Sequence, residues 1–148
     1  MVCNHCWEKD NKKANKLFHM GLFKEASVVY LRIYNGYLNL ENIEAKVSSD
    51  ELMLHVDRFI ITANNIIECV KAVNSTDKLR ELLELTTGAI RSLIERNPNI
   101  SSEDLNRLVL RLKTAENLFE LEAASESTVN THAEYIESTY GMSNTQRA

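Results

Sequence analysis

The segment 48–73 reads SSDELMLHVDRFIITANNIIECVKAV, and its apolar pattern is the strongest indication of the fold class. Apolar residues recur in it every three or four positions, the spacing that places side chains on one face of an α-helix. They are Leu52, Val56, Phe59, Ile60, Ala63, Ile66, Ile67, Val70 and Val73. Ser48 stands three residues before Glu51, which is the spacing of a capping box at a helix start. We therefore predict one long amphipathic helix here, with a buried face.

Helical spacing continues on the amino-terminal side of this segment. Residues 10–20 predict a first helix, with a start near Cys6 as the alternative, and Gly21 ends it because glycine accepts the left-handed conformation of a helix end. Residues 22–41 contain the run VVYLRIY (28–34), whose residue types favour a strand. The apolar residues of this region nevertheless fall at steps of three and four, so we predict a second helix.

A further helix follows the long one. Residues 79–94 carry apolar residues at helical steps, and Ser75 or Thr76 is the predicted cap. The sequence Asn97-Pro98-Asn99 ends this helix, because proline cannot extend a hydrogen-bonded helix interior.

The carboxyl-terminal third carries the last helical patterns. Ser101, with Asp104 at capping-box spacing, predicts the start of a fifth helix that runs toward Ala123. Helical steps between 129 and 140 predict a short docked sixth helix. Residues 141–148 are predicted to be a frayed tail.

Together these segments predict an all-α fold with residues 1–140 as a single helical domain. The scarcity of turn residues, 4 Gly and 1 Pro in 148 residues, argues against a turn-rich all-β fold. Because the connections between the helices are short and polar, neighbouring helices should be antiparallel. We predict antiparallel helical hairpins, in a superhelix or a bundle of five to six helices.

Composition excludes several classes of protein. A net charge of −4 provides no basic surface for nucleic acid. No apolar stretch approaches the roughly 18 residues that a membrane-spanning helix needs. The first twenty residues are too charged for a signal peptide, and an odd number of cysteines, 3, argues against a disulfide framework. These features predict a cytoplasmic protein with no membrane and no nucleic-acid partner.

The sequence offers little catalytic chemistry. Cys3-Asn4-His5-Cys6 has the spacing of a zinc-binding pair, but a structural zinc site normally needs a second ligand pair, and none is evident. Glycine-rich phosphate loops, the nucleophile-elbow motif and paired histidines are all absent from the sequence. We therefore predict that the protein is not an enzyme, with no catalytic residues, no metal and no cofactor.

The first helix pair resembles a tetratricopeptide repeat. The matching positions are Ala14, Leu17, Gly21, Phe23, Ala26, Tyr30 and Ile33. A second, longer hairpin matches at Ala63, Ile66, Leu82, Thr86 and Ala89. Trp7-Glu8-Lys9 and Glu51-Leu52-Met53 are also similar to a small uncharacterised bacterial family of tetratricopeptide-like proteins. The resemblance implies a stack of helical hairpins that binds other proteins.

The resemblance also implies a site, because in that family the first helix of each hairpin lines a concave groove. The positions that carry over are Glu8, Asn11, Asn15, Phe18, His19, Asp57, Ile60, Asn64, Ile67 and Glu68. Among them we select as partner-binding residues Asn15, Phe18, His19, Asn64, Ile67 and Glu68. The family's clamp for a peptide carboxylate is incomplete, because Asn11 replaces its lysine and Ile61 its second asparagine.

The predicted function is therefore a protein-interaction module that binds a peptide or a helix in a groove between helices. Two alternatives stay open at this point. One is an acidic bacterial chaperone for a secreted partner, which would share this size and charge. The other is a structural homo-oligomer such as a homodimer, since the third to fifth helices are rich in apolar residues.

Overall fold

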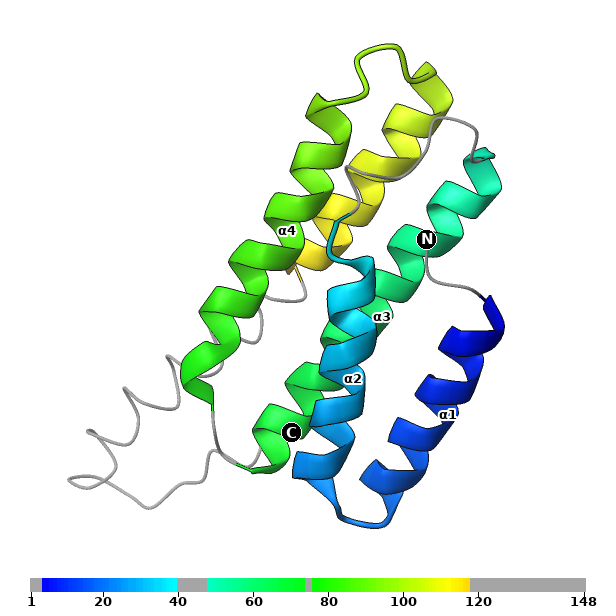
Figure 1. Ribbon diagram of the computed structural model, residues 1–148. Helices are drawn as coiled ribbons and strands as arrows, with labels where there is room; N and C mark the ends of the chain where they lie inside the picture. Colours follow the sequence, from blue (N-terminus) through cyan, green and yellow to red (C-terminus); the bar gives the residue numbers. More distant parts are fainter. Residues whose placement is uncertain (1–3, 40–47, 74–75, 118–148) are drawn as a thin grey trace, which may run out of the picture.

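The structure is a computed structural model that describes residues 4–39, 48–73 and 76–117. Over these residues the chain is all-α, as predicted (Figure 1). The elements are α1 (Asn4–His19), α2 (Phe23–Tyr37), α3 (Ser49–Ala72), the short 3-10 helix η2 (Thr76–Lys78), α4 (Leu79–Glu95) and a helical segment at 102–117. The predicted sixth helix at 129–140 and the tail at 141–148 lie outside the described residues.

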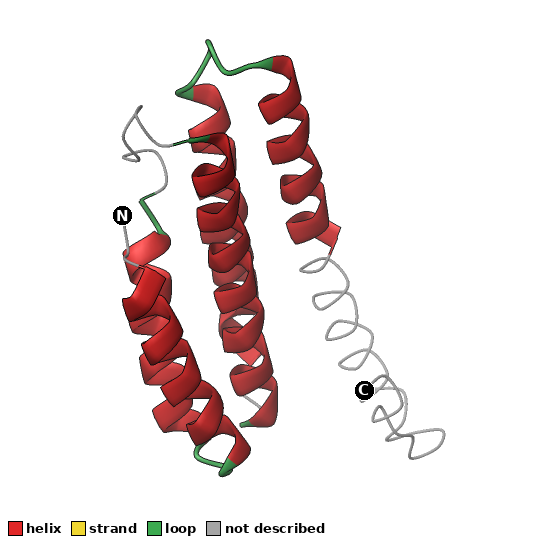
Figure 2. Cartoon of the chain, turned by 90° about the vertical axis from the view of Figure 1, so that its right-hand side faces the viewer, coloured by secondary structure: helices red, strands yellow, loops and turns green. Residues whose placement is uncertain are grey.

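The helices form antiparallel hairpins that stand side by side (Figure 2). The direction of α2 against α3 follows from their ring contacts, because Tyr37 meets His55 at 4.3 Å whereas Tyr34 meets Phe59 at 4.8 Å between ring centroids. Segment 102–117 runs antiparallel to α4, as Figure 1 shows, and Arg91 of α4 pairs with Glu116 of that segment. The predicted hairpin arrangement is therefore confirmed for the described residues.

Residues 28–34, which have strand-forming residue types, lie within α2. Four of these seven residues, Val29, Tyr30, Ile33 and Tyr34, are buried, and they fall on one side of the helix. Val28 and Leu31 fall on the other side and are 64% and 42% exposed. Burial of one helical face between neighbouring helices outweighs the modest strand preference of these residue types.

The helix ends confirm most of the predicted caps. The backbone N–H of Glu51 donates to Ser48 Oγ at 3.2 Å, and that of Asp104 donates to Ser101 Oγ at 3.1 Å. Gly21 has a φ of 79°, a left-handed conformation that a residue with a side chain adopts only with strain. Each serine satisfies a backbone donor that a helix start would otherwise leave unpaired.

Two predicted helix starts need correction. The start at Asp10 is too late, because α1 includes Asn4, and the alternative start near Cys6 agrees to within two residues; Trp7 and Ala14 lie on one continuous packed side of α1. The cap of α4 by Thr76 is wrong, because Thr76 belongs to η2 and Lys78 holds the N-cap position without a side-chain hydrogen bond. Ser75, the other predicted cap, lies outside the described residues.

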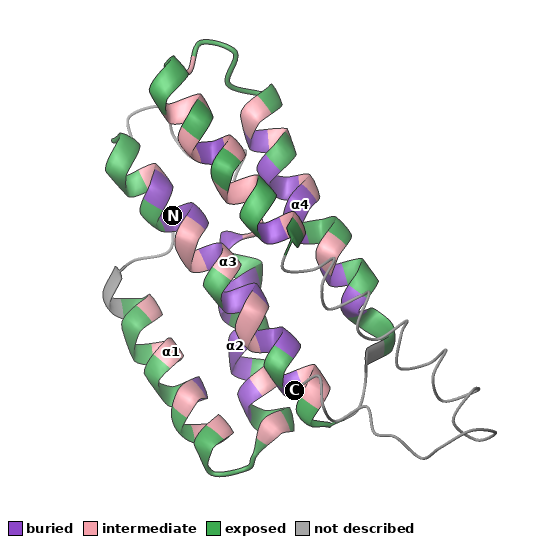
Figure 3. Ribbon diagram, turned by 180° about the vertical axis from the view of Figure 1, so that it is seen from behind, coloured by how far each residue is buried: buried purple, intermediate pink, exposed green. Residues whose placement is uncertain are grey.

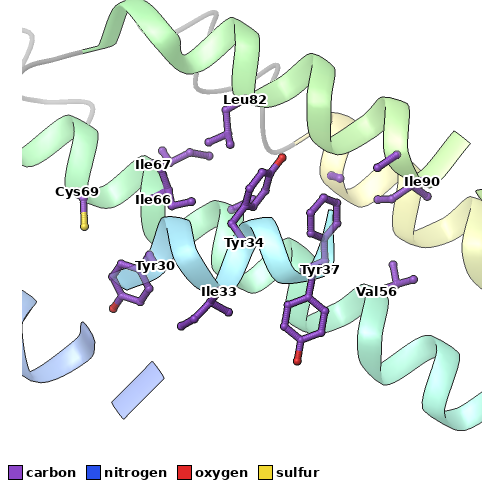
Figure 4. Packing of buried hydrophobic residues seen from close by; sticks show 14 of the residues in the cluster. Tyr30, Ile33, Tyr34, Tyr37, Val56, Ile66, Ile67, Cys69, Leu82 and Ile90 are labelled. Carbon is purple, nitrogen blue, oxygen red and sulfur yellow. The ribbon is translucent and has the colours of Figure 1, made fainter. Parts of the chain in front are cut away.

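Buried positions gather where the helices face one another (Figure 3). The core is centred on α2, α3 and α4, whose apolar side chains interdigitate in Figure 4. Tyr34 stacks on Phe59 with an interplanar angle of 23°, and its hydroxyl shares a 2.6 Å hydrogen bond with the Thr86 hydroxyl. Figure 4 shows the hydroxyls of Tyr34 and Tyr37 pointing in opposite directions, so α2 packs on both sides.

The cysteines differ in their states. Cys6 is disulfide-bonded, and Cys69 is a buried free thiol in α3. A bond at Cys6, at the exposed start of α1, is not the disulfide framework that the odd number of cysteines argued against. Burial raises the pKa of the Cys69 thiol to about 11, which keeps it protonated and unreactive at neutral pH.

Candidate interaction surface on three parallel helices

Three helices lie side by side and run in the same direction: α1, α3 and segment 102–117. The Arg58 guanidinium carbon stands 4.4 Å from the centroid of the Trp7 ring, which joins α3 to α1. On the other side of α3, Arg111 donates to both oxygens of Asp57, at 2.7 and 3.1 Å, which joins α3 to segment 102–117. A forked guanidinium–carboxylate pair fixes both distance and orientation.

A second set of contacts repeats this junction near the start of α3. Ser49 donates to Asp104 at 2.5 Å, and Arg107 lies 3.5 Å from Asp50. These pairs ascend together along both helices, from 49 with 104 to 57 with 111, so the two helices are parallel.

Each of these helices has a side turned away from the core. Successive helical residues are rotated by about 100°, so a residue two positions from a fully buried one lies on the opposite side. Ile61 precedes the buried Ala63 by two positions, and Leu54 likewise precedes the buried Val56. Leu110 follows the buried Leu108 by two positions. We call this shared surface the three-helix face; it is defined by Leu54, Ile61, Leu110, Lys12 and Lys16.

The apolar members of this face are well exposed. Leu54 is 40% exposed, Ile61 46% and Leu110 64%. Leu54 and Ile61 are seven residues apart, which is two helical turns, so they lie in line along α3. Exposed apolar side chains in line along a helix can pack against apolar side chains of a partner.

The three residues of α1 that were predicted to bind a partner differ in how exposed their side chains are. The Tyr30 hydroxyl donates to Asn15 Oδ1, so this amide already holds α1 against α2. The Phe18 ring meets Phe23 edge-on at 5.0 Å and packs against the core. His19 is exposed, with its ring 6.0 Å from that of Phe18. His19 is thus the one of the three whose side chain stands largely in solvent.

The predicted residues of α3 need a correction. Ile67 has no exposed surface, and Ile60 is packed against the core, so neither is available to a partner. Asn64 is half-buried, and Glu68 is exposed and pairs with Lys71 at 3.8 Å. The apolar residues that do reach solvent, Leu54 and Ile61, were not selected from the sequence.

The reason lies in how many neighbours surround α3. Because α1, α2, α4 and segment 102–117 all contact it, α3 is buried over most of its circumference and only a narrow strip is exposed. Leu54 and Ile61 are apolar residues that do not fit the three-four pattern of the buried face. In the sequence, this surface could have been predicted from apolar residues that stand outside the buried three-four pattern.

A second group of exposed apolar residues lies on the other layer, formed by α2 and α4. We call it the two-helix face and define it by Val28, Leu31 and Leu85. Leu31 is 42% exposed and Leu85 44%, values close to those of Leu54 and Ile61. Exposure alone therefore does not distinguish the two faces, and neither do cations, because exposed Lys24 and Arg32 stand one helical turn on either side of Val28.

Polar groups are buried without partners where α1 packs on α2 and α3. They are Trp7 Nε1, Asn11 Oδ1 and the Tyr37 hydroxyl, none of which has a hydrogen-bond partner among the described residues. His55, only 5% exposed, packs edge-on against Tyr37. Burial, with added positive charge from Arg58, lowers the pKa of His55 to about 4. The histidine is therefore neutral at physiological pH.

Comparisons of the chain with known protein families, with characterised proteins and with solved structures gave no match. None of the helices in the described ranges is long and apolar enough to cross a membrane. Within those ranges, His, Cys, Asp and Glu side chains do not gather in groups of three that could hold a metal ion.

Proposed function

We propose that the protein is an interaction module whose three-helix face binds a segment of a partner protein. The observation that carries this proposal is the row of exposed apolar side chains at Leu54, Ile61 and Leu110, on two helices that are held side by side by arginine–carboxylate pairs. Covering exposed apolar groups with a partner gains free energy through the hydrophobic effect, and exposed apolar groups gathered on one face mark interaction sites.

The architecture of the face supports the same proposal. A layer of parallel helices gives a rigid, extended surface on which a partner loses little of its binding energy to ordering the receptor. The resemblance of the first hairpin to a tetratricopeptide repeat also supports binding over catalysis, because that family binds partner segments on the first helices of its hairpins.

Matched variants of the full chain test this proposal. Ile61→Glu places a charge on the three-helix face, and Leu31→Glu places the same charge on the two-helix face at nearly equal exposure, 46% against 42%. Tagged wild-type and variant chains are used as bait in a lysate of the source organism, and retained proteins are identified by mass spectrometry. We expect proteins that the wild type and Leu31→Glu retain and Ile61→Glu loses.

The opposite pattern, with loss in Leu31→Glu alone, would assign binding to the two-helix face and refute the proposal. Analytical ultracentrifugation of the same three chains addresses self-association. If the wild type is a dimer and Ile61→Glu a monomer, the three-helix face pairs two copies of this chain instead of binding another protein.

A further inference from the structure

The amino-terminal end of α1 carries a disulfide whose second cysteine follows from the sequence. Cys6 is disulfide-bonded, Cys69 is a free thiol, and the chain has 3 cysteines in all. The partner of Cys6 within the chain is therefore Cys3, which itself lies outside the described residues. Because α1 begins at Asn4, this bond joins the position just before the helix to a residue of its first turn.

Two features distinguish this bond from a disulfide that serves stability alone. Cys6 is exposed, so a thiol in solution can reach it, whereas Cys69 is only 1% exposed. Cys3 and Cys6 are three positions apart, and the entropy that a cross-link removes from the unfolded chain grows with the length of the loop it closes. A short, exposed disulfide therefore stabilises the fold little and is open to exchange with other thiols.

The exchange reaction is complete with a small thiol as the only other reactant. A thiolate of the glutathione class attacks one sulfur of the Cys3–Cys6 bond, that bond breaks, and the other cysteine leaves as a thiolate. A second small thiolate attacks the mixed disulfide and releases the first cysteine. Two electrons and two protons thus pass from two small thiols to the cysteine pair, and the small thiols are joined in one disulfide.

The residue that follows Cys6 docks the amino-terminal half of α1. Trp7 is half-buried, and the Arg58 guanidinium carbon of α3 lies 4.4 Å from its ring centroid. Trp7 Nε1 is buried without a hydrogen-bond partner among the described residues, and so is Asn11 Oδ1 one turn later. The first turn of α1 also has no acidic side chain to interact favourably with its leading N–H groups. Unpaired buried groups oppose docking, so this half of the helix is weakly held.

The carboxyl-terminal half of α1 is held by a different set of contacts. Ala14 is fully buried, and Asn15 accepts a hydrogen bond from the Tyr30 hydroxyl. Phe18 meets Phe23 edge-on at 5.0 Å between ring centroids. None of these contacts involves the disulfide, so they should persist when it opens. The bond therefore restrains the part of α1 whose docking is weakest.

We propose that Cys3 and Cys6 form a reversible redox site for thiols of the glutathione class, and that its reduction releases segment 4–11 from α3. The disulfide limits the conformations open to the undocked first turn, which favours the docked state, and reduction removes that restraint. This inference is independent of the binding face proposed above. Trp7 is the single tryptophan of the chain, so its fluorescence reports directly on the docking of this segment.

Two readouts on the full chain test the two parts of this inference. The chain is equilibrated with reduced and oxidised glutathione at graded ratios, and its thiols are alkylated with N-ethylmaleimide and counted by mass spectrometry. The emission maximum of Trp7 is recorded at the same ratios. The double variant Cys3→Ser with Cys6→Ser lacks the bond, and Cys69→Ser is the matched control that removes the buried thiol and keeps the bond.

We expect the wild type and Cys69→Ser to gain two alkylated thiols together as the share of reduced glutathione increases. Over the same ratios the emission maximum of Trp7 should shift to longer wavelength, because the indole moves from a half-buried site into water. The double variant should show the long-wavelength emission at every ratio, with no response to glutathione.

The remaining outcomes overturn one part or both. A chain that stays unalkylated in excess reduced glutathione has an inert disulfide, and a chain that keeps both thiols in excess oxidised glutathione forms no stable bond; either result refutes the redox site. If the two thiols appear but the emission maximum of Trp7 does not move, or if it moves equally with glutathione in the double variant, the release of segment 4–11 is refuted.

Discussion

The two sides of α2 differ in how well their polar groups are satisfied. On the side that faces α4, Tyr34 stacks on Phe59 and shares a hydrogen bond with Thr86, although all three residues are buried. On the side that faces α1, Tyr37 is buried as deeply, yet its hydroxyl makes no hydrogen bond of good geometry among the described residues. Burial raises the pKa of Tyr37, and the nearby Arg58 guanidinium offsets only part of that rise. The Tyr34 hydroxyl therefore stabilises the fold through its hydrogen bond, whereas the buried Tyr37 hydroxyl, three residues away on the same helix, destabilises it.

This contrast indicates how stability is divided in the molecule. An unpaired buried hydroxyl, amide or indole N–H each costs about 1–3 kcal/mol relative to its hydrated state. The junction of α1 with α2 and α3 holds three such groups, whereas the Tyr34 hydroxyl on the α4 side is paired. We therefore expect α1 to be held less firmly than α4, and four measurements of stability test this difference.

The largest effect is expected on the α4 side, at Phe59. Its ring is fully buried against Tyr34, so Phe59→Ala removes a stacked contact and leaves a cavity that the rigid neighbours cannot fill. We expect a loss of about 3–5 kcal/mol in the free energy of unfolding, measured by urea denaturation. A loss below about 1 kcal/mol would mean that this side of α2 is not closely packed.

The second effect is on the α1 side and depends on pH. The pKa of His55 is about 4 in the folded protein, below its usual value of 6.5, so the unfolded state binds a proton at a higher pH than the folded state. The stability that neutral His55 contributes is therefore complete above pH 6.5 and is lost as the pH falls toward 4. This loss amounts to roughly 3 kcal/mol.

Urea denaturation of His55→Gln at several pH values between 7 and 4 checks this expectation. The variant should lose stability less steeply over that range than the wild type, since its side chain does not titrate. His19→Gln, which changes an exposed histidine, serves as the control and should keep the wild-type slope. Equal slopes in all three proteins would show that His55 is already protonated, or open to water, in the fold.

A smaller effect is expected when the paired tyrosine loses its hydroxyl. Tyr34→Phe keeps the ring on Phe59 but leaves the buried Thr86 hydroxyl without its partner. We expect the free energy of unfolding to fall by about 1–2 kcal/mol, the cost of leaving one buried hydroxyl unpaired. Thermal denaturation of the wild type and the variant in parallel would measure it.

The smallest effect is expected from the same change on the other side. Tyr37→Phe removes a buried hydroxyl that has no partner among the described residues, so the free energy of unfolding should stay within about 0.5 kcal/mol of wild type or rise. If Tyr37→Phe destabilised as much as Tyr34→Phe, the Tyr37 hydroxyl would have to be hydrogen-bonded, with the Arg58 guanidinium as the nearest candidate, and the contrast between the two sides would disappear.

The sequence was sufficient to determine where most helices lie and how they begin and end. Such features are local: Ser48 caps a helix through Glu51 three residues away, and Gly21 ends one through its own backbone conformation. The spacing of apolar residues likewise depends only on positions within a few turns. This is why residues 28–34 were correctly assigned to a helix in spite of their strand-forming residue types.

The tertiary structure alone decided which side of each helix is free. Ile61 and Ile67 are the same residue type on the same helix, but Ile61 is 46% exposed and Ile67 is fully buried, because the neighbours of α3 leave one narrow strip uncovered. Tyr34 and Tyr37 differ in the same way, since only Tyr34 meets a hydroxyl, on a helix more than fifty positions away in the sequence. Exposure and pairing depend on contacts between distant segments, which no local pattern encodes.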